Sequence, residues 1–405
     1  MAYKNYHFLK IDGRSLGYYA VLAVLMALLA VGGLSALFME HSGHHVTGMN
    51  NQIVWGMPHV FAVFLIVAAS GALNVASISS VFGRELYKPL SRLSGLLAIA
   101  LLAGGLAVLV LDLGRPERLV VAMTYYNFKS IFAWNILLYT GFFGVVIVYL
   151  WMMFERKMNV YSKPAGLAAF LWRLILTTGT GSIFGFLVAR RAYDSALYAP
   201  MFIIMSFAFG LAIFVLVMFA AYRGTDRPLG DVLVNRLRNL LGVFVAAVLY
   251  FVLVYHLTNL YITAQHDVER FILVDGGVYT RLFWIGQILA GGIIPLILLF
   301  AAPFSRSRAA FALACVLVIL GGMAQMYGII VGGQAFPLVL FPGMEVSSSF
   351  FDGAVGTYAP TPAEIGLGVG GFALALTLTA LAIKVLPFLP ASLADAAIDP
   401  HHKKA

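Results

Sequence analysis

The chain has 405 residues, of which 61% are hydrophobic and only 11% are charged. Soluble domains are about 45–50% apolar and about 25% charged, so this composition excludes a water-soluble globule and a disordered chain. The formal net charge of +9 would suit a nucleic-acid binder. That class is also excluded, because the charges fall between apolar runs long enough to cross a bilayer. The single cysteine, Cys315, excludes disulfides, cysteine-ligated zinc and iron–sulfur clusters within this chain.

Ten apolar runs follow one another, and we predict an all-α polytopic membrane protein with ten transmembrane helices. In lipid every backbone polar group must bond within the protein, so apolar runs of this length are helices. The first run is too long for the apolar part of a cleavable signal peptide. The predicted spans are 16–39, 55–82, 93–113, 131–154, 165–188, 200–221, 240–263, 282–302, 309–331 and 363–389.

Lys and Arg gather near the two termini and in the connections after the second, fourth, sixth and eighth spans. The positive-inside rule places these segments in the cytoplasm. Both termini are then cytoplasmic, and the number of spans must be even. The expected location is the bacterial cytoplasmic (inner) membrane.

The outer connection between the first two spans carries His41, His44 and His45. Their spacing matches no strong metal-binding motif, so we interpret them as solvated loop histidines and predict no metal site. The second span opens with Trp55 and reaches His59 just inside the bilayer. A neutral imidazole donates and accepts hydrogen bonds and takes up a proton near neutral pH. His59 is therefore a candidate catalytic and quinone-binding residue, the alternative being a histidine bonded to a neighbouring helix carbonyl.

The third span ends at Asp112, and Arg115 follows three residues later. This spacing puts two side chains on one helix face, so we expect them to pair. The pair can be an interfacial salt bridge. Alternatively, Asp112 accepts a proton from a bound quinol while Arg115 keeps it ionised, which makes both candidate catalytic residues.

Further polar residues lie at membrane depth, where their cost makes them functional candidates. Trp134 and Asn135 begin the fourth span, and for Asn135 we favour an interhelical hydrogen bond. Arg173, in the inner part of the fifth span, can snorkel to the headgroups or line a polar path to the cytoplasm. His256 ends the seventh span and shares a helix face with Asn259.

His59 and His256 are the histidines inside predicted spans, so a single two-histidine haem is geometrically possible. Four-helix cytochromes usually offer more such pairs, and we do not favour haem. The glycine-rich stretch 366–371 lies in the last span, where it permits close helix packing. The outer connection 332–362 is long and aromatic and has no Lys or Arg, so it is a candidate docking surface.

These segments together resemble the NrfD/PsrC family of polysulfide reductase-like membrane subunits. Residues 55–59 and 64–72 resemble the first bundle helix of the family, and 112–116 match its Asp-x-Gly-Arg-Pro element. Residues 126–130 resemble its connection between the third and fourth spans. Ten spans are similar to the HybB/DsrP-like branch, and within it the chain looks most like DsrP of the DsrMKJOP complex of sulfur metabolism.

The resemblance implies two four-helix bundles, 55–188 and 200–331, flanked by helices 16–39 and 363–389. It also implies a quinone or menaquinone at the outer side of the first bundle, contacted by His59, with no haem or metal in this chain. We add Asp112, Trp134 and Asn135 to the quinone-binding set. Tyr125 and Tyr126 are both candidates for the family's quinone-side tyrosine. A proton route would engage Asp112 and Arg173, to which we add His256.

The predicted function is a quinone-interacting membrane subunit that exchanges electrons with a periplasmic ferredoxin-like iron–sulfur subunit. The resemblance adds cytochrome c and haem-b membrane subunits of the same complex as partners. One alternative is a secondary transporter, because the fifth and tenth spans are rich in glycine, although few charges lie at the midplane. Another is a structural membrane anchor of a peripheral oxidoreductase, in which the outer polar residues only join helices.

Overall fold

The computed structural model describes residues 6–338 and 353–398. Within these residues ten helical spans are long and apolar enough to cross a membrane, which confirms the predicted number and the all-helical class. The spans are Leu16–Ser42, Met57–Ser80, Glu85–Leu111, Ile131–Phe154, Asn159–Gly185, Tyr198–Gly224, Asp231–Tyr261, Val278–Phe300, Arg308–Ala335 and Pro362–Val385.

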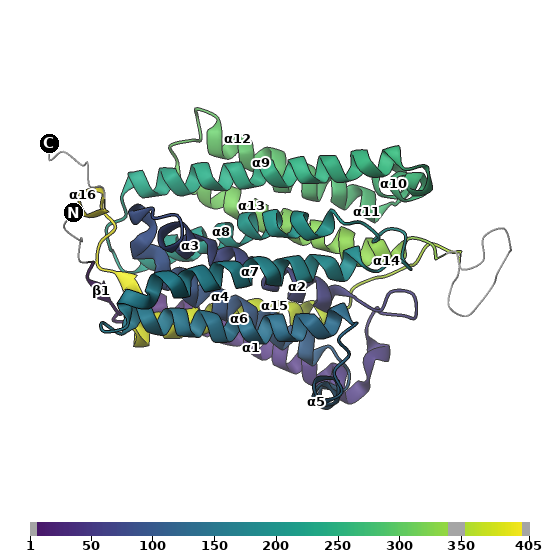
Figure 1. Cartoon of the computed structure of the whole chain (residues 1–405), viewed down its shortest axis with the longest axis horizontal. Helices are drawn as coiled ribbons and strands as arrows, with labels where there is room; N and C mark the ends of the chain where they lie inside the picture. The colour runs from purple at the N-terminus through teal and green to yellow at the C-terminus, as the bar shows by residue number, and fades with distance from the viewer. Residues whose placement is uncertain (1–5, 339–352, 399–405) are drawn as a thin grey trace.

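Five spans are single helices and five are built from consecutive shorter ones (Figure 1). The single helices are α1 (Leu16–Ser42), α6 (Ile131–Phe154), α8 (Tyr198–Gly224), α9 (Asp231–Tyr261) and α15 (Pro362–Val385). The composite spans are α2 (Met57–Ala72) with α3 (Asn74–Ser80), η2 (Glu85–Leu90) with α4 (Ser91–Leu111), η4 (Asn159–Tyr161) with α7 (Ser162–Gly185), α11 (Val278–Arg281) with η7 (Leu282–Ile293) and α12 (Ile294–Phe300), and α13 (Arg308–Tyr327) with η8 (Gly328–Gly332) and α14 (Gly333–Ala335).

Short elements fill the connections and pair the two ends of the described chain. The short helices are η1 (His44–Val46), η3 (Pro116–Arg118), α5 (Leu119–Thr124), η5 (Thr263–Gln265), α10 (His266–Arg270), η6 (Phe271–Asp275) and α16 (Asp395–Ile398). Strand β1 (Phe8–Leu9) pairs antiparallel with β2 (Leu389–Pro390), with Phe8 opposite Pro390. This pairing lies at the end of the molecule opposite α5, α10 and α14 (Figure 1), so the chain enters and leaves the spans on one side.

The boundary of the seventh span differs most from its prediction. Helix α9 begins at Asp231, well before residue 240, and its first turns carry Arg236 and Arg238. Hydropathy locates only the apolar part of such a helix, because the polar first turns lie beyond the bilayer core.

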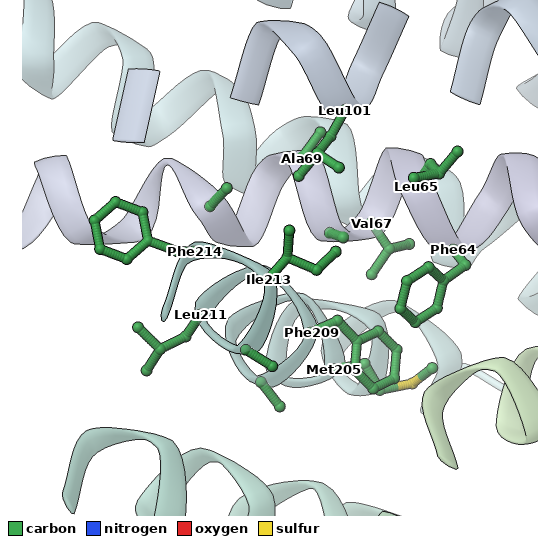
Figure 2. Packing of buried hydrophobic residues seen from close by; sticks show 14 of the residues in the cluster. Phe64, Leu65, Val67, Ala69, Leu101, Met205, Phe209, Leu211, Ile213 and Phe214 are labelled. Carbon is green, nitrogen blue, oxygen red and sulfur yellow. The ribbon is translucent and has the colours of Figure 1, made fainter. Parts of the chain in front are cut away.

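Helix α2 is the centre of the packing. Its span is the most buried of the ten, and it packs on α4, α7, α8 and α15. Figure 2 shows Phe64 of α2 facing Phe209 of α8, and their rings stack with centroids 5.0 Å apart. At Gly71 a side chain would overlap the carbonyl oxygen of Ser206, so glycine lets α2 and α8 approach closely. The core thus fixes the helix that carries His59.

The first and last spans pack against each other along the rim of the bundle. Helix α1 is the least buried span and lies against α15. A side chain at Gly370 of α15 would lie 2.6 Å from the Cα of Gly32 on α1. The prediction that the glycine-rich stretch permits close helix packing is confirmed.

The long outer connection is described only in part. Residues 339–352, including Phe341, Phe350 and Phe351 of the predicted docking surface, lie outside the described residues. The described flanks contact the segment before α2: the Oε1 of Gln334 accepts hydrogen bonds from the backbone N–H groups of Val54 and Trp55, each at 3.0 Å. The second half of the protein therefore holds the entry to α2 in place.

Candidate functional site

His59 lies in the first turn of α2. Gly56 caps this helix and Pro58 stands in its first turn, where proline costs no hydrogen bond because the first N–H groups of a helix have no partner within it. The backbone N–H of Met57 donates to the Tyr358 hydroxyl (2.6 Å), which in turn donates to Glu364 (2.7 Å). The start of α2 is thus tied to the start of α15, and His59 is held at the outer end of the molecule.

Asp112 faces His59. It caps the C-terminus of α4, and its side chain is fully buried. The His59 Nδ1 lies 2.8 Å from Asp112 Oδ2, while the imidazole keeps 17% exposure. The structure therefore brings together the two residues that the sequence analysis favoured most.

His44 completes this group. Its Nε2 lies 3.0 Å from the carbonyl oxygen of Asp112 and 3.6 Å from Asp112 Oδ1. Because a carbonyl only accepts, the Nε2 of His44 carries the hydrogen. Our interpretation of His44 as a solvated loop histidine is wrong. The error arose because Asp112 is 68 residues away in the sequence, and only the fold brings the two together.

The Asp112 carboxylate and the His44 imidazole stabilise each other's charged forms. Burial alone would raise the pKa of Asp112, but the contacts with His44 and His59 outweigh it and hold that pKa below its ordinary value of 3.8. The Asp112 contact raises the pKa of His44 above its ordinary 6.5, against the opposing effect of burial. At neutral pH Asp112 is therefore ionised.

His44 and His59 approach the Asp112 carboxylate without good hydrogen-bond alignment, so its oxygens keep unused acceptor capacity. Both its carboxylate oxygens are buried, and among the described residues neither receives a well-directed hydrogen bond, despite the 2.8 Å approach of His59. Buried polar atoms without a hydrogen bond are rare in folded proteins. The Asp112 oxygens therefore keep free acceptor capacity beside a partly exposed imidazole.

Arg115 does not pair with Asp112 as we expected. The helix ends at Leu111 and Gly114 has a φ of +69°, so the backbone turns away and three-residue spacing no longer puts the two side chains on one face. Within the described residues no ion pair involves Arg115, and the partners of Asp112 are His44 and His59.

An aromatic side chain, Trp55, packs on His59 and is itself contacted by aromatic side chains from several elements. The Trp55 ring stacks on the His59 imidazole with centroids 6.0 Å apart and planes at 26°. Trp55 also contacts Phe132 of α6, Phe184 of α7 and Tyr193 of the following connection. Trp55 was not among our predicted site residues, although it lies in the segment that carried the resemblance.

The two candidate tyrosines differ in their surroundings. Tyr125 is 84% exposed. Tyr126 packs against Phe128 and Trp134, and its buried hydroxyl has no hydrogen-bond partner among the described residues. The Trp134 Nε1 donates to the Phe128 carbonyl (2.8 Å). Tyr126 and Trp134 therefore form one aromatic cluster, and Tyr125 points out of it.

Asn135 joins two helices, as the favoured interpretation predicted. Its Nδ2 donates to the Gly179 carbonyl of α7 (3.1 Å), and its Oδ1 accepts from the Thr180 hydroxyl (3.4 Å). Tyr139 contacts the same hydroxyl at 3.3 Å. These residues begin a buried polar row inside the first group of helices.

Arg173 lies deeper in this row and is fully buried. It stands fourteen residues after Asn159, where its span begins, and at 1.5 Å per residue this is about 21 Å along the helix. The Arg173 Nη2 donates to Asn74 (2.9 Å), next to the break between α2 and α3. The alternative that Arg173 snorkels to the headgroups is wrong, because the side chain packs inward between Phe170 and Phe207.

A second histidine–carboxylate pair lies at the outer end of α9. The His256 Nδ1 lies 2.6 Å from Glu269 Oε2, and the Asn259 Nδ2 donates to Glu269 Oε1 (2.8 Å). His256 and Asn259 share a face, as predicted. Glu269 is fully buried and was not singled out from the sequence. In the sequence Glu269 is marked only by the aromatic and apolar stretch 271–274 that closely follows it.

A cavity of about 50 Å³ adjoins this second pair and is lined by His256, Gln287 and Gln325 among others. This volume holds roughly three or four water molecules. Three segments that line it, η6, η7 and η8, are π-helical. Such segments are rare and often occur at functional sites.

Comparisons with known proteins identify the family of this chain. Residues 45–338 match the model of the family described as polysulphide reductase, NrfD. The chain is 28% identical to the Hdr-like menaquinol oxidoreductase integral membrane subunit of Archaeoglobus fulgidus, over 95% of this chain and 96% of that protein. It is 24% identical to the protein NrfD of Escherichia coli, over 70% of this chain and 96% of that protein.

A third relative is the menaquinone reductase integral membrane subunit of Nitratidesulfovibrio vulgaris, 22% identical over 86% of both proteins. The matched family region begins before His59, ends after α14, and covers far more than half of the chain. The chain therefore belongs to the polysulphide reductase NrfD family.

Proposed function

We propose that this protein is the quinone-reactive membrane subunit of a redox complex and that quinone or quinol reacts beside His59 and Asp112. The carrying observation is the buried Asp112 carboxylate, which contacts His59 at 2.8 Å and retains acceptor capacity at the outer end of the spans. The names of the relatives from Archaeoglobus and Nitratidesulfovibrio, a menaquinol oxidoreductase subunit and a menaquinone reductase subunit, support this choice and favour menaquinone.

In the quinol-oxidising direction, the His59 Nε2 accepts the proton of a quinol hydroxyl while Nδ1 faces Asp112. The anionic carboxylate stabilises the imidazolium that forms, as a carboxylate does for other general-base histidines. Each quinol becomes quinone by losing two electrons, which pass to the redox partner, and two protons, which His59 takes up one after the other, releasing the first to the solvent to which its imidazole is partly exposed. The reverse direction uses the same groups with the proton transfers reversed, so the geometry serves either direction.

We assign the wall of the site to aromatic residues. Trp55 stacks on His59 and offers a flat face to a quinone ring, and Trp134 and Asn135 lie on α6, whose Phe132 contacts Trp55. Of the two tyrosines we favour Tyr126 as a quinone contact, because its hydroxyl is buried and lacks a partner among the described residues. Arg115 remains a candidate for the rim of the site, without a direct contact to Asp112.

The buried polar row inside the spans supports a proton route between this site and the opposite side. In this proposal Asp112 is the proton-exchanging group at the outer site, the row begins at Asn135, and Arg173 is its central charge. The Ser70 and Thr177 hydroxyl groups share a hydrogen bond of 2.6 Å, and the Ser70 hydroxyl also donates to the Arg173 carbonyl. Hydroxyl groups therefore continue the row. His256, beside the cavity of about 50 Å³, would form a separate proton-exchanging group at the outer end of α9.

The electrons pass to a partner, for which we propose a periplasmic ferredoxin-like iron–sulfur subunit, with cytochrome c and haem-b membrane subunits in the same sulfur-metabolising complex. Helix α5 supports an outer docking surface next to the site. It exposes Val120, Val121 and Met123, and large apolar side chains exposed together often mark interaction surfaces.

Replacing His59 tests the proposed reaction. In the purified complex, His59→Ala should lower quinol-linked electron transfer about 10²–10⁴-fold, the usual effect of removing a general base. The matched control is His45→Ala, an exposed histidine of the preceding connection, which should keep the wild-type rate. Wild-type rates in an assembled His59→Ala complex would remove His59 from the site. Loss of quinone-analogue binding in the same variant would argue against a purely structural anchor.

A further inference from the structure

A narrow apolar crevice runs along one half of the molecule, at the end where β1 and β2 lie. Its volume is about 460 Å³, and it separates the pair α1 and α15 from α8. Its walls include Val21 and Leu25 of α1, Leu216 and Ala220 of α8, and Phe372 and Ile383 of α15. By the positive-inside rule this is the cytoplasmic half.

The length of the crevice matches one leaflet of a bilayer. Phe372 and Ile383, which line its two ends on α15, are eleven residues apart, or about 16 Å at 1.5 Å per residue. The hydrocarbon core of a bilayer is about 30 Å thick, so the crevice is about one leaflet deep. An apolar cavity of about 150 Å³ already binds benzene, and this crevice is three times larger. An acyl chain fits its depth and its chemistry, whereas a transmembrane helix would need both leaflets.

A basic recess adjoins the crevice at the membrane surface. It measures about 600 Å³ and shares Ala220 with the crevice. Three arginines and one carboxylate line it, namely Arg223, Arg227, Arg308 and Asp226. The excess of positive charge at this position suits an anionic headgroup.

The three arginines differ in how far the protein already engages them. Arg227 donates to the Lys10 carbonyl (2.9 Å), and Arg308 pairs with Asp231 (2.6 Å). Arg223 is exposed, and within the described residues no hydrogen bond or ion pair involves its side chain. Arg223 is thus the cation best able to contact a phosphate group.

We propose that this crevice and recess form a binding site for one anionic phospholipid, with an acyl chain along α8 and α15 and the phosphate beside Arg223. Charge complementarity at the recess and the one-leaflet depth of the crevice select this occupant. The site lies at the end of the spans opposite His59, so the lipid fastens the α1–α15 pair to α8 and takes no part in the redox reaction.

Lipid binding to the full-length protein in its complex tests this site. Native mass spectrometry would compare phosphatidylglycerol with phosphatidylcholine of the same acyl chains. We expect tighter binding of phosphatidylglycerol, and Arg223→Gln should weaken it about five-fold, the effect of one basic residue near a membrane surface. The matched control, Arg306→Gln, removes an exposed arginine of the neighbouring connection that does not line the recess, and it should leave binding unchanged.

A second variant tests the crevice itself. Ala220 is exposed where crevice and recess meet, so Ala220→Phe fills the space without disturbing the core, and it should abolish the preference for phosphatidylglycerol while quinol-linked activity continues. Equal binding of the two lipids by the wild type, or an equal loss in Arg306→Gln, would overturn the proposal. The proposal would also be overturned if the wild-type complex held no lipid and the Ala220→Phe variant failed to assemble. That result would mean that a segment of a partner subunit occupies the crevice.

Discussion

Among the described residues two buried carboxylates at the outer end contact histidines, and they differ in how completely the carboxylate is satisfied. The first pair is Asp112 with His59, which His44 also approaches, and the second pair is Glu269 with His256. In the second pair both oxygens of Glu269 are engaged, one by His256 at 2.6 Å and one by Asn259 at 2.8 Å. In the first pair Asp112 lies 2.8 Å from His59, yet neither of its oxygens receives a well-directed hydrogen bond among the described residues.

The difference separates a carboxylate whose acceptor capacity is used from one whose acceptor capacity is free. A satisfied buried carboxylate stabilises the packing around it, and a ligand could reach it only by breaking existing hydrogen bonds. An unsatisfied one gains free energy when a hydroxyl group arrives. A buried charge in a membrane protein is thus not by itself a reactive site, and its unused hydrogen-bonding capacity is the more useful indicator.

The largest expected effect distinguishes the two carboxylates by rate. Asp112→Asn should lower quinol-linked electron transfer on the order of 10²–10⁴-fold, because the neutral amide no longer stabilises the His59 imidazolium. Glu269→Gln, the matched substitution in the second pair, should leave the rate near that of the wild type. Steady-state quinol oxidation by the assembled complex measures both, and equal losses would erase the distinction between the pairs.

The next effect concerns stability, and here the substitution in the second pair should cost more than the substitution in the first. Glu269→Ala leaves His256 and Asn259 without their partner, and each unpaired buried group costs on the order of 1–3 kcal/mol. Asp112→Ala removes a carboxylate that already lacks aligned donors, so its cost should be smaller. Thermal unfolding in detergent gives the comparison. A less stable Asp112→Ala protein would mean that the first pair carries more of the fold than its geometry indicates.

The smallest effect is a pH dependence of the contact between His44 and Asp112. Because the folded pKa of His44 is raised above 6.5, its contact with Asp112 stabilises fully below that pH and is lost as the pH rises through the raised value. Because the folded pKa of Asp112 is lowered below 3.8, its contribution is present above that value and lost in stronger acid.

His44→Gln tests this window, since glutamine keeps a donor but does not titrate. The wild type should unfold at a higher temperature than His44→Gln between about pH 4 and the raised pKa of His44. The gap should close as the pH rises further. His41→Gln serves as the control, because His41 is exposed in the same connection. A gap that persists unchanged at alkaline pH would show that His44 acts without its charge.

Part of the candidate site was predictable from local sequence and part was not. His59 stands out because a histidine at membrane depth is costly, and Asn135 because amides join membrane helices. The Arg115 prediction failed because it assumed a continuing helix, whereas Gly114 turns the backbone. His44 and Glu269 were missed because their partners depend on how separate connections fold over the helix ends.

The sequence by itself determined the number of spans, their helical nature and the family, because apolar length and backbone satisfaction in lipid leave few alternatives. Only the tertiary structure decided which polar residues meet: Asp112 with His44 and His59, Glu269 with His256, and Arg173 with Asn74. The physical reason is that hydropathy acts along one segment at a time, whereas a buried polar group is satisfied by whatever the packing of distant helices brings within about 3 Å of it.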